Sequence, residues 1–392
     1  MKIIIANYSV LPFHPPGGIE KYVLYFSRAL RQEGAEVEVV ASTPPGGEQD
    51  AELDGVRYTF LAPSTEWDRP FAWGPSLRNL LFSLNLARYL RRRHFDILHA
   101  YNTTPYPYLR LRRHAPVVHQ PFEEVMNYGL AAEEHLSLTK HLSVRAKRHM
   151  DRYILTHADA VACENQGQQD DFARIFGVVP DRMFILPVGV DIATVDAVLK
   201  TQRLSRKELG IAEKDFVLVS VNRLFPLKGV NYLVEAFAEV VREIPCARLV
   251  LVGTGPEEDA IKTQIRQLGL EEEIRHLKCI PEDRLYALYA LADVYVSPTL
   301  HISSSQSVIE AMACGLPVVS SGQEFWVQNG VNGYVVPQRD PLALAHAVVK
   351  TYDNDRRRSF AMMSRQAAQE YDSRAIATRA LERYQQLLSH RG

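Results

Sequence analysis

Short apolar runs alternate with amphipathic stretches along this sequence. The apolar runs predict strands over residues 3–6, 36–41, 96–99, 117–119, 160–162, 216–221, 248–252, 293–296 and 317–320. The stretches between them predict helices over residues 19–32, 77–93, 231–242, 257–268 and 308–313. A strand, a helix and a further strand close as a right-handed crossover. The alternation therefore predicts an α/β architecture with parallel sheets that helices cover on both faces.

The strand-and-helix pattern starts twice. Met1 opens the first series and Phe216 opens the second, and the stretch between them is turn-rich and then polar. We therefore predict two Rossmann-like, doubly wound domains that face each other across a cleft. They would cover residues 1–190 and 215–370, joined by a linker at 191–214. Residues 371–392 would form a C-terminal helix that crosses back to the first domain.

Composition and charge exclude several classes of protein. Hydrophobic residues are 46% of the chain and charged residues 23%, which excludes a largely disordered chain. The net charge of −1 does not fit a nucleic-acid binder. Four scattered cysteines form no CxxC pair and favour a reducing compartment. No apolar run reaches the length of a signal peptide or a membrane span, so we expect a cytoplasmic protein.

One stretch departs from this charge balance. Residues 77–114 contain eight arginines and a single acidic residue, Asp96. Solvated helix faces would account for the pattern. The functional alternative is a basic surface in the Arg78–Arg113 region that meets anionic lipid or a phosphorylated acceptor. Peripheral contact with the inner face of a membrane is therefore an expectation.

Two loops between a strand and a helix are suited to anions, because open α/β sheets bind ligands beyond the carboxyl ends of their strands. The first loop ends in Gly17 and Gly18, whose backbone can approach an anion at a helix N-terminus. Its counterpart in the second half carries Arg223 and Lys228, two cations at a spacing that suits a diphosphate. A tight turn and two solvated side chains are the respective alternatives.

A serine-rich loop precedes the helix predicted at 308–313. Ser303, Ser304 and Ser305 offer a helix cap and free amides for a phosphate. Glu310 follows on an otherwise apolar helix, where its burial requires hydrogen-bond donors such as two ribose hydroxyls. A glutamate whose partners all lie within the protein is the alternative.

His119 ends a predicted buried strand in the first half, and His99 ends the strand before it. A lone histidine is usually a packed core residue. The carboxyl end of a strand nevertheless makes His119 a candidate active-site group, and His99 a weaker candidate. No Walker loop, nucleophile elbow, His-Glu-x-x-His or DxD motif is present. We therefore predict no metal and no cofactor, so that cations and helix ends neutralise a bound diphosphate.

The chain resembles glycosyltransferase family 4, whose members are retaining nucleotide-sugar transferases of the GT-B fold. The resemblance covers almost the whole chain and rests on motifs in a fixed order. They are Gly17-Gly-Ile-Glu20, Pro187-Val-Gly-Val-Asp191, Asn222-Arg-Leu…Lys228-Gly229, Gly253-Thr-Gly-Pro256, Glu310-Ala-Met-Ala-Cys-Gly-Leu-Pro-Val-Val319 and Asn329-Gly-Val-Asn-Gly333.

The resemblance implies an acceptor-binding first domain and a donor-binding second domain. By position, Arg223 and Lys228 would hold the donor's diphosphate, Glu310 would bind its ribose, and Gly18 would approach the phosphates. His119 matches the family's active-site histidine, which would orient and stabilise the transferred sugar. The implied reaction is metal-independent. It moves a hexose-type sugar from a UDP or GDP sugar to a sugar, lipid-linked or small-molecule acceptor, with attack on the same face.

Two positions depart from the family pattern. Ile302 stands where the family usually has a second glutamate that binds hydroxyls of the donor sugar, and serines replace the adjoining Gly-Phe-Gly. Lys278 stands where a glycine is often found, near the base. Loss of a buried acceptor for sugar hydroxyls should alter the choice of sugar or weaken donor binding.

Three functions compete on this sequence. The intact set of Arg223, Lys228, Glu310 and His119 favours an active retaining glycosyltransferase. Ile302 motivates the alternative, a non-catalytic nucleotide-sugar-binding partner subunit on the same fold. The third is another GT-B activity, such as a sugar-nucleotide epimerase or a phosphorylase.

Overall fold

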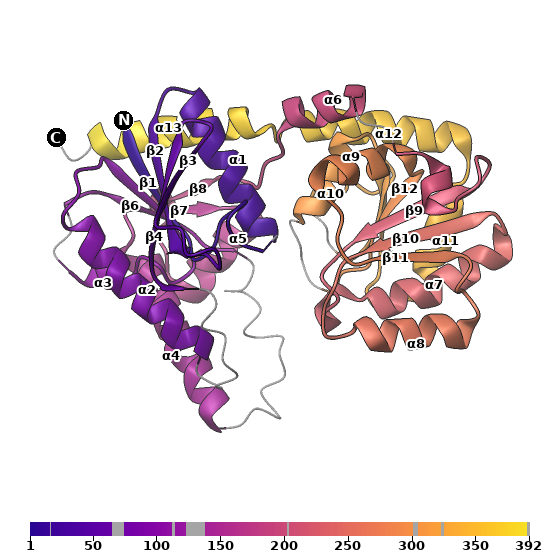
Figure 1. The fold of residues 1–392 in the computed structure, drawn as a ribbon, viewed down its shortest axis with the longest axis horizontal. Helices are drawn as coiled ribbons and strands as arrows, with labels where there is room; N and C mark the ends of the chain where they lie inside the picture. The colour runs from indigo at the N-terminus through magenta and orange to yellow at the C-terminus, as the bar shows by residue number, and fades with distance from the viewer. Residues whose placement is uncertain are drawn as a thin grey trace. The chain divides into compact units, whose positions relative to one another are not determined.

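The chain divides into two compact α/β units (Figure 1). The computed structural model describes residues 1–15, 17–64, 74–111, 114–122, 138–201, 204–300, 305–322 and 325–389, and the side chains of 64, 74–76 and 138–143 lie outside that description. The first unit comprises Met1–Gly189 together with Ser373–Gly392, and the second comprises Val190–Asp372. The assignment of acceptor and donor to these units stays a prediction.

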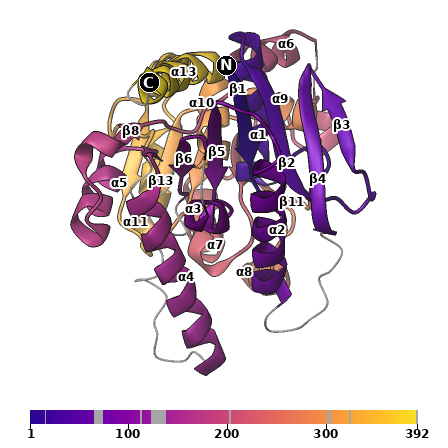
Figure 2. The same cartoon turned by 90° about the vertical axis from the view of Figure 1, so that its left-hand side faces the viewer.

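The first unit is built on a sheet with the strand order β3-β4-β2-β1-β5-β6-β7-β8. The strands are β1 (Lys2–Ala6), β2 (Glu36–Thr43), β3 (Asp50–Leu53), β4 (Val56–Ser64), β5 (Ile97–Tyr101), β6 (Val117–Gln120), β7 (Ala160–Cys163) and β8 (Met183–Ile185). Figure 2 shows β3 and β4 at one edge. They pair antiparallel, so the expectation of purely parallel sheets is wrong there. The reason is the two-residue turn at Asp54 and Gly55, whose φ angles of 53° and 73° suit a tight hairpin.

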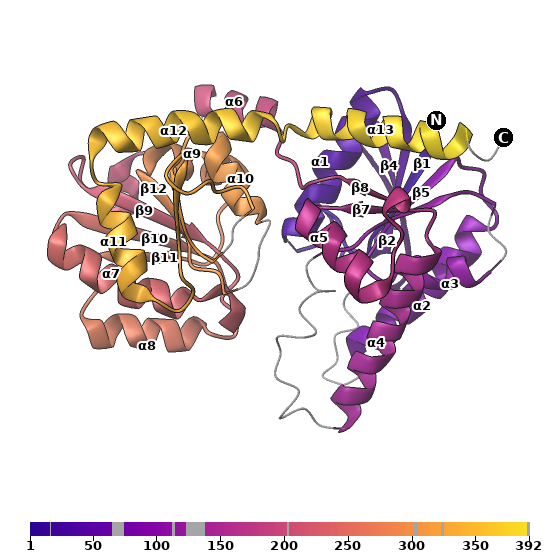
Figure 3. The same ribbon diagram turned by 180° about the vertical axis from the view of Figure 1, so that it is seen from behind.

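Helices cover both faces of the first sheet. They are α1 (Gly18–Gln32), α2 (Gly74–Leu90), α3 (Tyr106–Arg110), α4 (Leu138–His157), α5 (Gln166–Asp171) and α13 (Ser373–Ser389). One face packs Phe82 and Leu86 of α2 against Leu98 and Val117 of the sheet in one apolar cluster. On the opposite face α13 lies beside α1, as Figure 3 shows from behind.

Helix α13 confirms the expected crossing of the C-terminal helix to the first unit. Arg374 pairs with Glu33, the residue directly after α1, at 3.0 Å between Nη2 and Oε1. The Tyr384 hydroxyl is fully buried and lies 2.5 Å from Nδ1 of His99 on β5. These contacts attach the last described helix to the centre of the first sheet.

The second unit is built on a parallel sheet with the strand order β11-β10-β9-β12-β13-β14. The strands are β9 (Phe216–Val221), β10 (Ala247–Val252), β11 (Ile274–Leu277), β12 (Val294–Ser297), β13 (Val318–Ser321) and β14 (Gly333–Val336). The helices are α6 (Ile192–Thr201), α7 (Val230–Glu243), α8 (Glu258–Leu268), α9 (Glu282–Leu291), α10 (Gln306–Ala313), α11 (Pro341–Lys350) and α12 (Asn354–Gln369). Apolar residues of α7, α8 and α11 share one core with the sheet. Helix α6 lies within the stretch expected as a linker.

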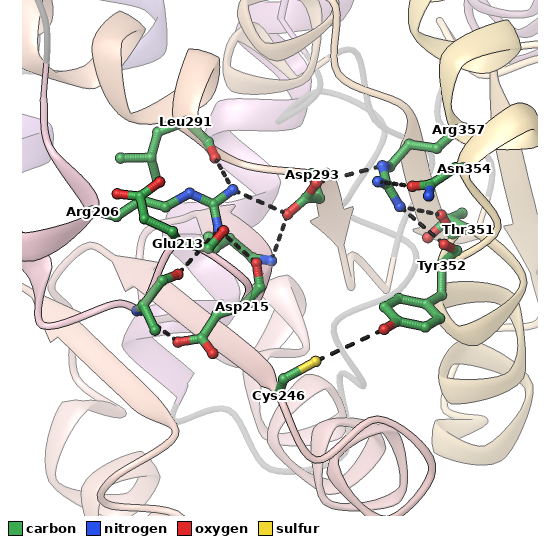
Figure 4. A network of polar contacts seen from close by, with 12 residues as sticks. Arg206, Glu213, Asp215, Cys246, Leu291, Asp293, Thr351, Tyr352, Asn354 and Arg357 are labelled. Atoms are coloured by element: carbon green, nitrogen blue, oxygen red, sulfur yellow. Dashed lines mark hydrogen bonds and ion pairs between the residues drawn. The ribbon is translucent and has the colours of Figure 1, made fainter.

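An ionic network holds the amino-terminal ends of β9 and β12 (Figure 4). The Asp293 carboxylate accepts from the Val217 amide at 2.9 Å and lies between the guanidinium groups of Arg206 and Arg357, at 3.5 and 3.4 Å. Arg206 also donates to the Asp215 carbonyl at 2.6 Å. The network lies at the end of the sheet opposite to the loops after the strands, so it supports the fold away from any site at those loops.

Among the described residues, no helix combines the length and the hydropathy needed to cross a bilayer.

Candidate active site

The second sheet changes the direction of its strand order between β9 and β12, which is where open α/β sheets bind ligands. The loops that follow these two strands touch through their backbones. The Leu300 amide donates to the Leu227 carbonyl at 2.9 Å. Gly229 has a φ of 61°, and a Cβ there would lie 2.1 Å from the Pro298 carbonyl oxygen. The contact requires glycine at position 229 and fixes the two loops beside each other.

Arg223 and Lys228 stand on the loop after β9, as the sequence predicts. Arg223 is exposed, with its guanidinium 5.4 Å from the ring centre of Phe225, and Lys228 is half-buried at the end of a short turn. Within the part of the chain that the structure describes, no carboxylate pairs with either side chain. Two uncompensated cations on one short loop attract an anion.

Two further glycines support this loop from beneath. A Cβ at Gly253 would lie 1.8 Å from the Asn222 carbonyl oxygen, and one at Gly255 would lie 2.3 Å from the Leu224 carbonyl oxygen. The Leu224 amide donates to the Thr254 carbonyl at 2.9 Å. The Gly253-Thr-Gly255 sequence of the family resemblance is thus a packing requirement of the cationic loop.

Glu310 is buried on α10, as its apolar surroundings predict. It is 2% exposed, and the Gln306 side chain donates to its Oε1 at 3.2 Å. Ser305 occupies the N-cap position of α10, as the sequence predicts, although its side chain makes no capping hydrogen bond. Its Oγ lies 3.3 Å from Oγ of Ser307 instead. Ser303, Ser304 and Ile302 lie outside the described residues.

The beginning of α10 is tied to the end of β9. The Ser307 hydroxyl donates to the Val221 carbonyl at 3.1 Å, and the Tyr295 hydroxyl lies 2.8 Å from Oγ of Ser307. These bonds place the helix that carries Glu310 next to the loop that carries Arg223 and Lys228. The second unit therefore brings the cations and the carboxylate to one edge of its sheet.

His119 lies at the carboxyl end of β6 in the first unit, and it is neutral at pH 7. Burial lowers the pKa of His119 to about 4, although the hydrogen bond to Ala100 opposes the shift. Its Nδ1 lies 3.1 Å from the Ala100 carbonyl, which can only accept, so Nδ1 carries the proton. Nε2 is then a hydrogen-bond acceptor. The side chain can orient a hydroxyl, and it is a poor acid.

His99 has a structural role, which makes its weaker candidacy for the active site wrong. Its Nε2 donates to Oε1 of Gln120 at 3.0 Å, and its Nδ1 accepts from the Tyr384 hydroxyl. Gln120 in turn donates to the Leu186 carbonyl at 3.0 Å. Burial lowers the pKa of His99 to about 3. Every polar atom of the imidazole is thus engaged in holding α13 and the end of β6.

Gly17 and Gly18 begin helix α1, as predicted, and an acidic side chain lies beside them. A Cβ at Gly17 would lie 2.2 Å from Oε2 of Glu20. The Glu20 carboxylate accepts from the Ser9 hydroxyl at 2.5 Å. The loop is therefore closely packed on a side chain of its own first helical turn.

The sequence argument missed a polar cluster around Tyr8, just after β1. The Tyr8 hydroxyl lies 2.7 Å from Oγ1 of Thr103 and 3.3 Å from Oγ of Ser83. Burial raises the pKa of Tyr8, and the nearby charges of Asp151 and Arg78 act on it in opposite directions. Residues 8 and 103 follow neighbouring strands, and that position is the signal that could have revealed them.

The cluster also contains an ion pair between a buried aspartate and a half-buried lysine. Asp151, which is 2% exposed, lies 3.3 Å from Nζ of Lys147 on α4. Asn102 follows β5 with a φ of 53° and donates to Oδ1 of Asn7 at 3.0 Å. Cationic, anionic and neutral polar groups thus surround the carboxyl ends of β1 and β5, where the first sheet also changes the direction of its strand order.

Both units match models of glycosyltransferases. Residues 16–194 match the model described as Glycosyltransferase Family 4, and residues 201–370 match the one described as Glycosyl transferases group 1. The chain is a GT-B glycosyltransferase that resembles family 4. The resemblance inferred from the motifs and the predicted fold class are both confirmed.

Similar proteins share this glycosyltransferase assignment. D-inositol 3-phosphate glycosyltransferase of Corynebacterium efficiens is 26% identical over 91% of this chain and 88% of the relative. The protein of the same name from Kineococcus radiotolerans is 27% identical over 96% and 92%.

Solved structures share the GT-B fold at low identity. Sucrose-phosphate synthase of Thermosynechococcus elongatus superposes with a TM-score of 0.83 at 22% identity, covering 99% of both chains. Anabaena HepE, solved in complex with UDP-glucose, superposes with a TM-score of 0.73 at 22% identity, over 98% of this glycosyltransferase and 100% of HepE.

Proposed function

We propose that this glycosyltransferase is a retaining enzyme that moves a hexose-type sugar from a nucleoside-diphosphate donor to an acceptor hydroxyl. The observation that carries the proposal is the convergence, at the switch point between β9 and β12, of a buried carboxylate and two cations that have no carboxylate partner among the described residues. A diphosphate suits Arg223 and Lys228, and a pair of ribose hydroxyls suits the Glu310 carboxylate, whose two oxygens can each accept. Gly17, Gly18 and the serines at 303–305 would offer amides to phosphate or sugar.

We propose that the nucleotide of the donor is UDP. Its support is the binding of UDP and UDP-glucose by Anabaena HepE, a protein of the same fold. The chain's own residues supply the neutralising charge, so the proposed reaction needs no divalent cation.

The proposed chemistry is attack on the same face as departure. The bond between the anomeric carbon and the diphosphate oxygen breaks, and the acceptor oxygen bonds to that carbon from the same side. The acceptor's proton passes to the leaving diphosphate oxygen. Arg223 and Lys228 would stabilise the charge that develops on that diphosphate. His119 would accept a hydrogen bond from a sugar hydroxyl through Nε2 and thereby orient the donor sugar.

The acceptor we propose carries a phosphate. Lys147 and Arg78 lie close enough to the polar cluster to act on His119 and Tyr8 respectively, and they would meet such a group. The names of the Corynebacterium and Kineococcus relatives point the same way, to an inositol 3-phosphate. A lipid-linked phosphate is the second source. We place the enzyme in the cytoplasm, in peripheral contact with anionic membrane through the Arg78–Arg113 region.

Transfer assays test the proposal. The purified chain is incubated with UDP- and GDP-sugars and with D-inositol 3-phosphate, and product anomers are assigned by NMR. We expect nucleoside-diphosphate release that depends on the acceptor and a product that keeps the donor's anomeric configuration. His119→Ala should lower kcat on the order of 100-fold. An inverted product would refute the same-face mechanism.

The same assay separates the alternative of a non-catalytic partner subunit, which Ile302 motivates. Thermal shift detects nucleotide binding, because a ligand of the folded state raises its stability. Binding of a UDP-sugar without transfer or hydrolysis, unchanged by His119→Ala, would favour the partner subunit.

A further inference from the structure

Helix α2 presents apolar side chains on the face that points away from the core. Leu77, Leu80 and Leu84 are 51%, 43% and 38% exposed. Their spacing places them on one face, while Phe82 and Leu86 face the core with no exposed area. The outer face of a surface helix is normally polar, so a leucine stripe there is a candidate contact surface.

Arginines follow the leucines along the chain, at the end of α2 and in the turn after it. Arg88 is exposed on the last full turn of α2, and the exposed Arg91, Arg92 and Arg93 follow it directly. The acidic residue of this stretch, Asp96, is engaged elsewhere, because its Oδ2 accepts from the Lys2 amide at 2.7 Å. Across the described ranges, no carboxylate pairs with these four arginines.

Helix α3 extends this surface. It packs against α2 in the same unit and ends with Arg110, which Leu111 follows; both are exposed, the latter at 42%. Figures 1 and 2 show α2 and α3 on the same side of the first sheet. We call these side chains together the α2–α3 surface. It consists of Leu77, Leu80, Leu84, Arg88, Arg91, Arg92, Arg93, Arg110 and Leu111. It joins apolar side chains to arginines for which the described residues supply no carboxylate partner.

We propose that the α2–α3 surface docks on an anionic lipid bilayer, with the leucines of α2 inserted at the headgroup boundary and the arginines paired with lipid phosphates. Charge complementarity identifies the occupant. A polyanion such as a nucleic acid would use the arginines and leave the leucines in water. An interfacial helix uses both, because apolar burial and attraction to anionic lipid add.

This inference deepens the proposed function and rests on its membrane contact. Contact by charge alone would be lost at high salt, because exposed charges are screened. Inserted leucines leave a part of the binding that salt does not remove. The inner side of α2 carries Ser83, which contacts Tyr8 in the polar cluster. Docking would therefore hold that cluster about one helix diameter, roughly 10 Å, from the lipid headgroups.

Vesicle flotation of the full chain tests the proposal. The vesicles are phosphatidylcholine with or without about 30% phosphatidylglycerol, at low and at high salt. We expect binding only to the anionic vesicles, with a fraction that survives high salt. The triple variant Leu77→Ser, Leu80→Ser, Leu84→Ser should lose that surviving fraction, on the order of tenfold for each leucine that inserts. Arg88→Gln, Arg91→Gln, Arg92→Gln should lose about fivefold for each charge and the preference for anionic lipid.

Matched controls lie in the second unit. Leu342 is 57% exposed and Leu268 is 42% exposed, so Leu342→Ser with Leu268→Ser removes similar apolar area elsewhere. Arg242→Gln removes an exposed charge on α7. Neither control should change vesicle binding. Equal binding to neutral and anionic vesicles, or wild-type binding by the leucine variant at every salt concentration, would overturn the proposal.

Activity on water-soluble D-inositol 3-phosphate is measured for the same variants. The leucine variant should keep full transfer to this acceptor while losing vesicle binding. Transfer without any vesicle binding by the wild type would refute the docking proposal and leave the proposed enzyme function standing. Vesicle binding without transfer to any acceptor would sink the proposed enzyme function and leave the docking surface standing.

Discussion

The loop after β1 and the loop after β9 hold the same place in two copies of one architecture, and their chemistry is opposite. The first ends in two glycines, of which Gly17 packs against the carboxylate of Glu20. The second carries Arg223 and Lys228, with no carboxylate partner among the described residues. The topology of the sheet sets where a ligand can bind, and the side chains there set which part of the ligand is bound.

The two units also differ in how they hold their polar groups. Histidines whose pKa burial lowers, namely His14, His99 and His119, all lie in the first unit. The second unit holds its cationic loop by backbone contacts at glycines. The first site therefore depends on neutral buried side chains, and the second depends on close backbone packing.

Acid should destabilise the first unit strongly. The folded-state pKa values of His119 and His99, about 4 and about 3, lie below the ordinary value of 6.5. Between the folded-state pKa and the ordinary pKa, the unfolded chain binds protons that the folded unit does not bind. The free energy of unfolding therefore falls as pH drops below 6.5. Each histidine contributes about 1.4 kcal/mol per pH unit. Hydrogen exchange at pH 5 and pH 7, corrected for intrinsic rates, should show β5 and β6 losing protection. Unchanged protection there would contradict the prediction.

Removal of a cation from the β9 loop should impair the donor step. Arg223→Ala and Lys228→Ala should each lower kcat/KM by about 10- to 150-fold, which corresponds to about 1.5–3 kcal/mol for a charge-assisted hydrogen bond. Steady-state kinetics with a UDP-sugar measure the effect. Arg242→Ala on α7 is the matched control and should leave kcat/KM unchanged. A similar loss in both kinds of variant would mean that net charge, and not the loop, matters.

An added methyl group should destabilise the two glycine-containing loops to different extents, because different atoms pack against their glycines. Gly255→Ala forces Cβ toward the Leu224 carbonyl, which is backbone and cannot rotate away. We expect about 1–3 kcal/mol of destabilisation. Gly17→Ala meets the end of the flexible Glu20 side chain and should cost less. Urea unfolding of both variants gives the comparison, and the reverse order would show that the β1 loop is the more rigid one.

Loss of one hydroxyl from α13 should have the smallest effect. Tyr384→Phe removes the donor to Nδ1 of His99 and should cost about 1 kcal/mol. The urea midpoint and the imidazole nitrogen shifts of His99 report the change. A wild-type midpoint together with an unchanged tautomer of His99 would show that this hydrogen bond contributes nothing.

The regular elements could be predicted from the sequence because their periodicity is local. Strand 216–221 matches the structure residue for residue, and helix α13 (Ser373–Ser389) lies within the predicted range 371–392. The hairpin at Asp54 and Gly55 was missed although its turn residues carry the signal. The burial of Glu310 followed from its apolar neighbours.

The roles of the histidines could not be predicted in the same way. His99 and His119 end the two predicted strands 96–99 and 117–119 and look alike in the sequence. They differ because the partner of His99 is Tyr384, which lies 285 residues away along the chain, while the partner of His119 is a neighbouring backbone carbonyl. A partner so distant in the chain leaves no local pattern.

The contact between Tyr384 and His99 makes the first unit discontinuous in the chain. Residues 1–189 leave the ribosome before the helix that completes their fold, and the whole second unit is made between the two. The second unit, which is contiguous from Val190 to Asp372, can finish folding earlier. Domains of a nascent chain usually fold from the N-terminus onward. Here the first unit can complete its fold only after the second unit and helix α13 have been made.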